Sequence, residues 1–194
     1  MDNLTAFARV AAQITDTVPA KAPPPVHLWH PPFCGRIDMR IARDGTWFYQ
    51  GTPLVRPAMV KLFASILRKD PERYVLVTPV EMVEIMVEDA PFVAVEMQIN
   101  PHLPRQEVRF RTNVDDWMVA SRDHPFRFIS EATGGLKPYI RVRGDLWARA
   151  TRSVYMEIVD AATERLIDGN MVLGLDSAGE FFPIASNQTI GDAR

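Results

Sequence analysis

The chain has 194 residues, a formal net charge of −2 at pH 7 and one cysteine, Cys34. Its content of 47% hydrophobic and 24% charged residues is that of a globular protein and excludes general disorder. The nearly neutral charge argues against a nucleic-acid partner, and a lone cysteine cannot close an internal disulfide. Since no run resembles a signal peptide or a membrane span, we expect a cytoplasmic protein.

Residues 1–32 are predicted to form an amphipathic helix followed by a proline-rich extended linker. Apolar residues recur at helical spacing between Leu4 and Ile14, and Asn3 is available as the N-cap. Six prolines follow between Val18 and Pro32, and they fix φ and remove backbone donors, which excludes a continuous helix. The helix is expected to dock on its own domain, with docking on a partner protein or a second copy as the alternative.

Residues 33–100 are predicted to form a first α+β unit. Alternating apolar and polar residues from Ile37 to Ile41 indicate a half-buried strand, and Asp44-Gly45 predicts a hairpin turn into a second strand at 46–49. Pro57 suits the first turn of a helix whose apolar face runs from Met59 to Leu67. Strands are then expected at 74–78, 82–87 and 92–99.

Residues 101–194 are predicted to form a second α+β unit, separated from the first by the proline-containing loop 100–104. Strands are expected at 108–111, 117–120, 139–143 and 146–150. Thr151 is placed to cap a helix that ends near Ala162. Two more strands, at 170–173 and 180–184, complete the unit.

The two halves can be aligned with a constant shift of 96 positions. This shift places Met59 on Tyr155 and Arg56 on Arg152, so that each half has two strands, an arginine-led helix and two more strands. We therefore predict an α+β fold made of two related antiparallel ββαββ-type units that pack together, because a repeated unit buries its open face against its neighbour.

Several sequence blocks carry a resemblance to a known family. These blocks are 35–56 (GRIDMRIARDGTWFYQGTPLVR), 62–65, 76–81, 87–92, 110–113 and 138–142. Together they resemble a bacterial family of unknown function, domain of unknown function 1285, over most of 34–184. The resemblance implies a two-part α+β fold with duplicated motifs, the second part superficially like a pleckstrin-homology domain. It also implies a site at the interface of the two halves and a role in signal transduction, and it supplies no catalytic residue.

Arginine is the residue type that points to a ligand. Between 105 and 152, nine of the ten basic residues are arginine, whereas 70–96 holds seven acids and a single base. The guanidinium fork matches carboxylate and phosphate, so the bias predicts a small anionic ligand or an acidic peptide at the interface of the halves. The predicted ligand-binding residues are Arg40, Trp47, Arg56, Tyr139, Arg141, Arg143 and Arg152. The alternative is that these arginines pair with acids of the first half, such as Glu81, Glu88 and Asp89, or face solvent.

A metal site is not expected. His27 and His30 with Cys34 have an HxxH-like spacing, but the surrounding prolines oppose a compact ligand turn, and no CxxC or HExxH motif is present. We predict neither metal nor cofactor and no catalytic residue. The sequence favours a non-enzymatic ligand-binding or regulatory module. The alternatives are a hydrolase that uses Asp38 or Glu81 as a general base, or an assembly module that uses the N-terminal helix.

Overall fold

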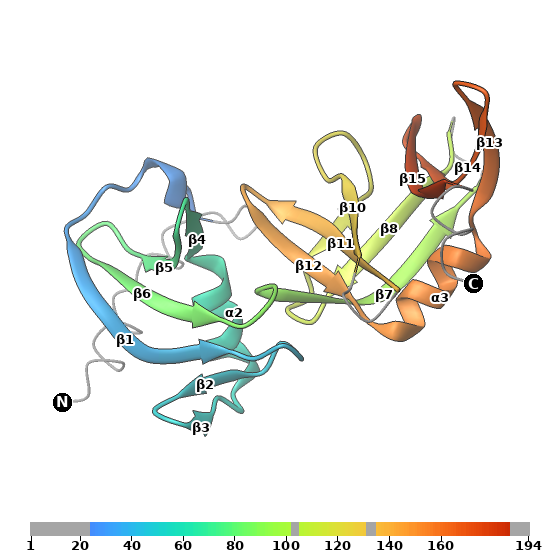
Figure 1. Ribbon diagram of the computed structural model, residues 1–194. Coiled ribbons are helices and arrows are strands. Elements are labelled where there is room, and N and C mark those ends of the chain that lie inside the picture. Colours follow the sequence, from blue (N-terminus) through green and yellow to red (C-terminus); the bar gives the residue numbers. More distant parts are fainter. Residues whose placement is uncertain (1–23, 102–104, 131–134, 187–194) are drawn as a thin grey trace. The chain divides into compact units, whose positions relative to one another are not determined.

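The computed structural model describes residues 24–101, 105–130 and 135–186 (Figure 1). The helix predicted between Leu4 and Ile14 lies outside the described residues. Strands account for 54% and helices for 14% of the described chain, so the protein is mostly β and the α+β prediction is wrong. The chain groups into two compact units: Met1–Pro91 with Gly144–Leu146, and Phe92–Arg143 with Trp147–Arg194. The strand at Phe92, which the sequence pattern assigned to the first unit, belongs to the second.

The first unit is a six-stranded sheet with one α-helix. Its elements are η1 (Val26–Leu28), β1 (Phe33–Ile41), β2 (Trp47–Tyr49), β3 (Thr52–Pro53), α2 (Pro57–Ser65), β4 (Leu67–Asp70), β5 (Arg73–Val77) and β6 (Met82–Val87). The strand order is β3-β2-β1-β6-β5-β4. Two antiparallel three-stranded meanders are thus joined by the parallel pairing of β1 with β6. We call this parallel pairing the seam.

The second unit holds a sheet with the same connectivity, followed by a helix and a small third sheet. Its elements are β7 (Phe92–Asn100), β8 (Glu107–Thr112), β9 (Trp117–Val119), β10 (Phe126–Ser130), β11 (Leu136–Arg143), β12 (Leu146–Ala150), α3 (Arg152–Asp160), β13 (Thr163–Ile167), β14 (Asn170–Ser177) and β15 (Glu180–Ser186). The larger sheet has the order β10-β11-β12-β7-β8-β9, with β7 and β12 parallel. Its seam therefore corresponds to that of the first unit.

This topology corrects the predicted ββαββ units. Both large sheets are mixed rather than antiparallel, because each contains a parallel seam. The helices that the 96-residue shift superposed occupy different places: α2 joins β3 to β4 inside the first sheet, whereas α3 follows β12 and leads into the separate sheet β13-β14-β15. The two units share a strand order and not a helix position. The likeness to a pleckstrin-homology domain is not confirmed.

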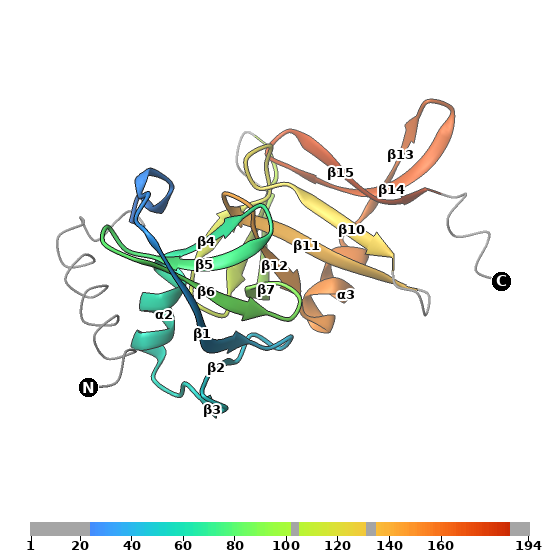
Figure 2. The same cartoon turned by 60° about the vertical axis from the view of Figure 1, so that its left-hand side comes forward.

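The core of the first unit lies between the sheet and α2, which covers one face of the sheet in both views (Figures 1 and 2). Alternation along β1 places Met39 and Ile41 in this core. Trp47 on β2 is 1% exposed, and its ring stacks on Phe63 of α2 with centroids 6.3 Å apart. The predicted turn at Asp44-Gly45 is confirmed: Thr46 donates its backbone N–H to Asp44 Oδ1 at 2.9 Å, and Gly45 has a φ of 86°, which favours glycine.

The proline-rich segment is fixed to the first unit by Arg68 on β4. Its Nη1 donates to the carbonyl oxygens of Val26 at 2.9 Å and Trp29 at 2.7 Å. Its Nε donates to Asp70 Oδ1 at 2.7 Å, so the half-buried guanidinium is held by several acceptors at once. Arg68 thus attaches η1 beside β4, an edge strand of the sheet.

The core of the second unit joins its two sheets through aromatic rings. Phe126 on β10 meets Phe110 on β8 edge-on at 4.9 Å and Phe182 on β15 at 5.4 Å between centroids. Figure 2 shows β15 running beside β10. Buried Ser177 adds a polar link, since its Oγ accepts from the Val108 N–H at 2.9 Å and donates to the Ala120 carbonyl at 2.7 Å. Among the described helices, none has the length and apolarity needed to cross a bilayer.

Candidate functional site

The seam of the first unit is irregular. Its parallel register aligns Phe33 with Met82, Arg36 with Glu84 and Arg40 with Met86. Four steps along β1 from Arg36 to Arg40 therefore match two steps along β6, so β1 carries extra residues and bows away from its partner. Bulges of this kind redirect side chains and interrupt the ladder.

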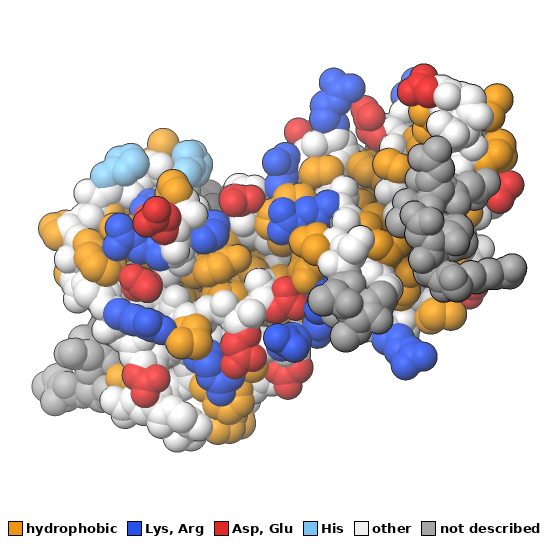
Figure 3. Space-filling model, viewed as in Figure 1, with side chains coloured by type: hydrophobic (Ala, Val, Ile, Leu, Met, Phe, Trp, Pro, Cys, Tyr) orange, Lys and Arg blue, Asp and Glu red, His pale blue; other side chains and the backbone are white. Residues whose placement is uncertain are grey.

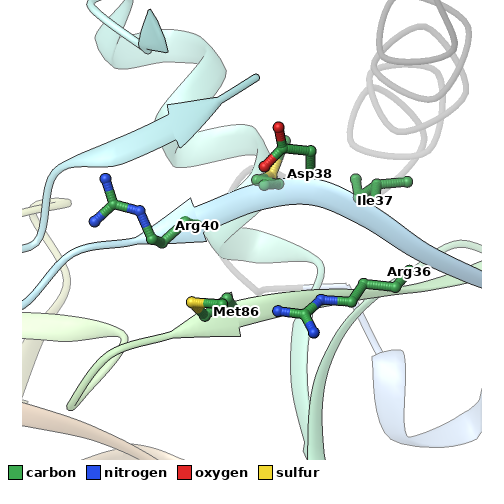
Figure 4. A pocket seen from close by; sticks show the side chains of 6 residues that line it. Arg36, Ile37, Asp38, Arg40 and Met86 are labelled. Atoms are coloured by element: carbon green, nitrogen blue, oxygen red, sulfur yellow. The ribbon is translucent and has the colours of Figure 1, made fainter. Parts of the chain in front are cut away.

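The bulge produces a shallow groove of about 320 Å³, at the lower end of the size range of ligand sites. Figure 4 shows that the Arg36 side chain extends over β6 toward Met86, whereas Asp38 points to the other side of β1. We call this feature the β1 groove. It is lined by Arg36, Ile37, Asp38, Met39, Arg40 and Met86.

Arg40 is held in place from two sides. It forms an ion pair with Glu88, and its guanidinium carbon lies 4.2 Å from the centre of the Phe48 ring. Glu88 also accepts the backbone N–H of Arg43 at 3.0 Å. The hydrogen bond from Arg43, followed by that from Arg40, lowers the pKa of the Glu88 carboxyl group below its ordinary value. The charge of Arg40 is thus already matched by a carboxylate.

Arg36 differs from Arg40 because it is exposed and lies in the groove without a recorded partner. Within the described ranges, no hydrogen bond, ion pair or ring contact engages its guanidinium. The same holds for the exposed carboxylate of Asp38, although the Asp38 carbonyl accepts from Gln50 N at 2.9 Å. Met86 is 43% exposed beside them. The groove therefore offers an available guanidinium next to an accessible thioether.

The other predicted residues of the first unit lie outside the groove. Trp47 belongs to the core described above, and its buried Nε1 has no hydrogen-bond partner among the residues that the structure describes. Arg56 is the N-cap residue of α2, is exposed and makes no side-chain cap hydrogen bond. No described contact joins it to Asp38, Asp44 or Glu81, the partners considered for a buried bridge.

Three predicted residues of the second unit follow one another at every second position of β11. Tyr139 is 5% exposed. Arg141 donates through Nε and Nη2 to the Asp123 carbonyl at 3.1 and 3.0 Å. Arg143 pairs with Asp116 at 2.9 Å, and its guanidinium carbon lies 5.1 Å from the Phe92 ring centre. Both arginines are thus engaged by groups of their own unit, and their role in ligand binding stays a prediction.

Most of the remaining arginines that the structure describes in the second unit are also engaged, and the exceptions are Arg105 and Arg152. Arg111 pairs with Glu96 at 2.7 Å and with Asp115 at 2.9 Å. The hydrogen bond from Arg111 is the main cause that lowers the pKa of Glu96, and the two acids raise the pKa of Arg111. Arg152 is the exposed first residue of α3, and no described contact engages it. On the face in Figure 3, basic and acidic side chains alternate, with no broad field of one sign.

Sequence reasoning missed Arg36, Met86 and Glu88 as members or neighbours of a site. The alternation of Arg36, Asp38 and Arg40 predicts the polar side of a strand. A β-bulge, however, produces no residue pattern that a single sequence reveals. Glu88 was considered only as one of several acids that could pair with arginine. No group of three or more potential metal ligands is found in the part of the chain that the structure describes. Cys34 is exposed there and contacts the Pro32 carbonyl at 3.6 Å.

Comparison with known families identifies both units. Residues 24–90 match the model of the N-terminal domain of DUF1285, a domain of unknown function, and residues 91–184 match the model of its C-terminal domain. The chain belongs to the DUF1285 family. The resemblance inferred from the sequence blocks is thereby confirmed. No match is found among the curated proteins.

Two solved structures of DUF1285 proteins resemble the chain. A family protein from Silicibacter pomeroyi shares 46% identity with a TM-score of 0.84, over 98% of this chain and 99% of that one. A second, from Shewanella baltica, shares 28% identity with a TM-score of 0.52, over 64% of this chain and 91% of that one. The family is one of unknown function.

Proposed function

We propose that this DUF1285 protein is a non-catalytic binding module and that its β1 groove binds an anion, either a small ligand or an acidic segment of a peptide. The observation that carries the proposal is the exposed guanidinium of Arg36, which no described residue engages, in a groove whose second arginine is already fixed. A guanidinium that is free to donate two parallel hydrogen bonds binds a carboxylate or phosphate oxygen pair well. Regulation, the other half of the predicted role, would follow from such binding.

Binding is a better account than hydrolysis because of how the two candidate carboxylates are placed. Asp38 lines the groove without a described hydrogen bond to a nucleophile or a second base. Glu81 precedes β6 and is engaged through its backbone by the buried Thr78, which accepts the Glu81 N–H at 3.1 Å and donates to its carbonyl at 3.2 Å. A general base needs to lie within hydrogen-bond reach of the proton it removes. The described contacts supply no such arrangement.

The test is a thermal-shift titration of the parent chain and of Arg36→Gln with acetate, inorganic phosphate and a tetraglutamate peptide. A ligand that binds only the folded state adds about 2.7 kcal/mol at one hundred times its Kd. For a chain of this size this corresponds to a rise in Tm of about 5 to 10 °C. We expect this rise in the parent with at least one anion and its loss in Arg36→Gln.

Arg56→Gln is the matched control, since Arg56 is also exposed and unengaged but lies outside the groove. It should respond to the anions as the parent does. If Arg36→Gln keeps the full response, the anion binds elsewhere. If no anion shifts the parent, the binding proposal itself is wrong.

A further inference from the structure

The charges of the β1 groove limit the anion that it can hold. Arg40 is neutralised by Glu88, and Arg36 is the lining cation that no residue of the described ranges engages. Asp38 also lines the groove, and Glu84 stands opposite Arg36 in the register of the seam. Asp38 points to the other side of β1, so a dianion on Arg36 would meet one available guanidinium with the Glu84 carboxylate opposite it in register, and that like charge disfavours it. A planar monoanion needs only the fork of Arg36.

The rest of the lining is apolar. Ile37 and Met39 come from the bulged part of β1, and the exposed thioether of Met86 comes from β6. In Figure 4 the Arg36 guanidinium lies toward Met86, so a group bound by the arginine has a flexible apolar side chain beside it. Methionine adapts its shape to different apolar ligands. The groove therefore offers two neighbouring contacts: Arg36 for a charged group of a ligand, and Met86 for its apolar part.

We propose that the β1 groove selects monocarboxylates that carry an apolar chain, with the carboxylate on Arg36 and the chain on Met86. This inference rests on the proposed function and narrows it to one ligand class. Two sources supply this chemistry, a short fatty acid and the C-terminal residue of a peptide with an apolar side chain. Their shared feature, a single carboxylate next to hydrocarbon, is what the groove recognises.

The experiment measures Kd by NMR titration, following the Met86 methyl signal and the Arg36 Nε–H. The probes are acetate, butanoate, hexanoate, N-acetyl-leucine, N-acetyl-leucinamide and inorganic phosphate. Full burial of a methylene gives about a fourfold gain in affinity, and because the groove is open we expect about a twofold gain for each added methylene. Hexanoate should bind at least tenfold more tightly than acetate, and N-acetyl-leucinamide, which lacks the carboxylate, should not bind.

Variants of Met86 and Arg36 assign the contacts. Met86→Gln should remove the dependence on chain length, whereas Met86→Leu, which stays apolar, should keep that dependence. Met156→Gln is the matched control, because Met156 is 50% exposed on α3 and lies outside the groove. Arg36→Lys keeps the positive charge but lacks the planar guanidinium fork, and it should weaken the binding of every carboxylate probe.

The outcomes separate this inference from the proposed function. If phosphate binds as tightly as hexanoate, or if chain length has no effect, the groove is an anion site without the proposed selectivity. If no probe binds the parent, both proposals fail. Tighter binding of hexanoate supports a fatty-acid source, and tighter binding of N-acetyl-leucine supports a peptide C-terminus.

Discussion

The two large sheets of this protein have the same strand order but differ in the regularity of the parallel seam. In the second unit, Phe92, Val93 and Ala94 of β7 pair in continuous register with the residues 148–150 of β12. In the first unit, the corresponding pairing of β1 with β6 shifts register twice, and the groove opens beside the shift. The topology alone therefore does not create the candidate site. The extra residues of β1, which are inserted into only one of the two similar sheets, create it.

The ends of the two sheets are also protected in different ways. In the first unit, η1 lies beside β4 and is attached by Arg68. In the second unit, β15 of the third sheet lies beside β10. An uncovered sheet edge exposes unpaired backbone groups and invites aggregation. The edge strand β4 of the first sheet is thus covered by the short segment η1, whereas the edge strand β10 of the second sheet is covered by a strand of the third sheet.

The largest expected effect tests whether Trp47 is a core residue. Trp47→Ala removes a ring packed on Phe63 and should lower the free energy of unfolding by about 3 to 5 kcal/mol. Phe110→Ala is the counterpart in the second unit and should cost a similar amount. Urea denaturation followed by circular dichroism measures both. A loss below about 1 kcal/mol for Trp47→Ala would contradict the core assignment.

The second prediction concerns the attachment of η1. Arg68→Met removes a guanidinium that donates to two carbonyl groups and to Asp70, and hydrogen bonds of charged groups contribute about 1.5 to 3 kcal/mol. We expect a loss in this range and faster amide hydrogen exchange at residues 26–29. Arg56→Met, which removes an unengaged arginine, should change neither quantity. Unchanged exchange in Arg68→Met would show that the prolines alone hold the segment.

The third prediction compares the starts of the two helices. Thr151 caps α3 by accepting the Val154 N–H at 3.3 Å, whereas Arg56 offers α2 no side-chain cap. Thr151→Ala should destabilise the protein by about 1 kcal/mol, and Arg56→Ser should stabilise it by about 0.5 to 1 kcal/mol. Thermal unfolding of both variants checks the opposite signs. Destabilisation by Arg56→Ser would reveal a structural role for that arginine.

The smallest expected effect concerns how the free energy of unfolding depends on pH in the acidic range. The pKa of Glu96 is lowered in the folded state, chiefly by Arg111, so its contribution to stability is present above the pKa of the unfolded chain. The contribution is lost as the pH falls below about 4.5 through the folded pKa. Glu96→Gln should therefore reduce the slope of stability against pH between about pH 5 and pH 3. Glu164→Gln, an exposed acid without a described partner, should leave the slope unchanged.

Local patterns in the sequence predicted many elements well. The alternation in β1, the Asp44-Gly45 turn, the helix start at Pro57 and the strand at 82–87 follow from short-range chemistry and are confirmed. The end of α2 was misjudged, because Ile66 and Leu67 continue its apolar spacing. The structure ends the helix at Ser65 and places the buried Leu67 in β4, opposite Leu76. Tertiary pairing here overrides periodicity.

The candidate site was less predictable for the same reason. Arg40 was singled out by residue type alone, and it does line the groove. Whether Arg36 is available depends on a register shift between strands that are more than 40 residues apart, which no local pattern encodes. The two arginines of β11 carry the same guanidinium group, but the fold places Asp116 and the Asp123 carbonyl within hydrogen-bond distance of them.

The seams also fix an order of events during synthesis. Each seam joins the first strand of a sheet to its last, so a nascent chain can make both hairpin meanders early but cannot close the sheet before the final strand leaves the ribosome. The first sheet becomes complete once Val87 has emerged, while the strands of the second are still being translated. The seam that carries the bulge is therefore the first of the two that can form, before α3 or the third sheet has been synthesised.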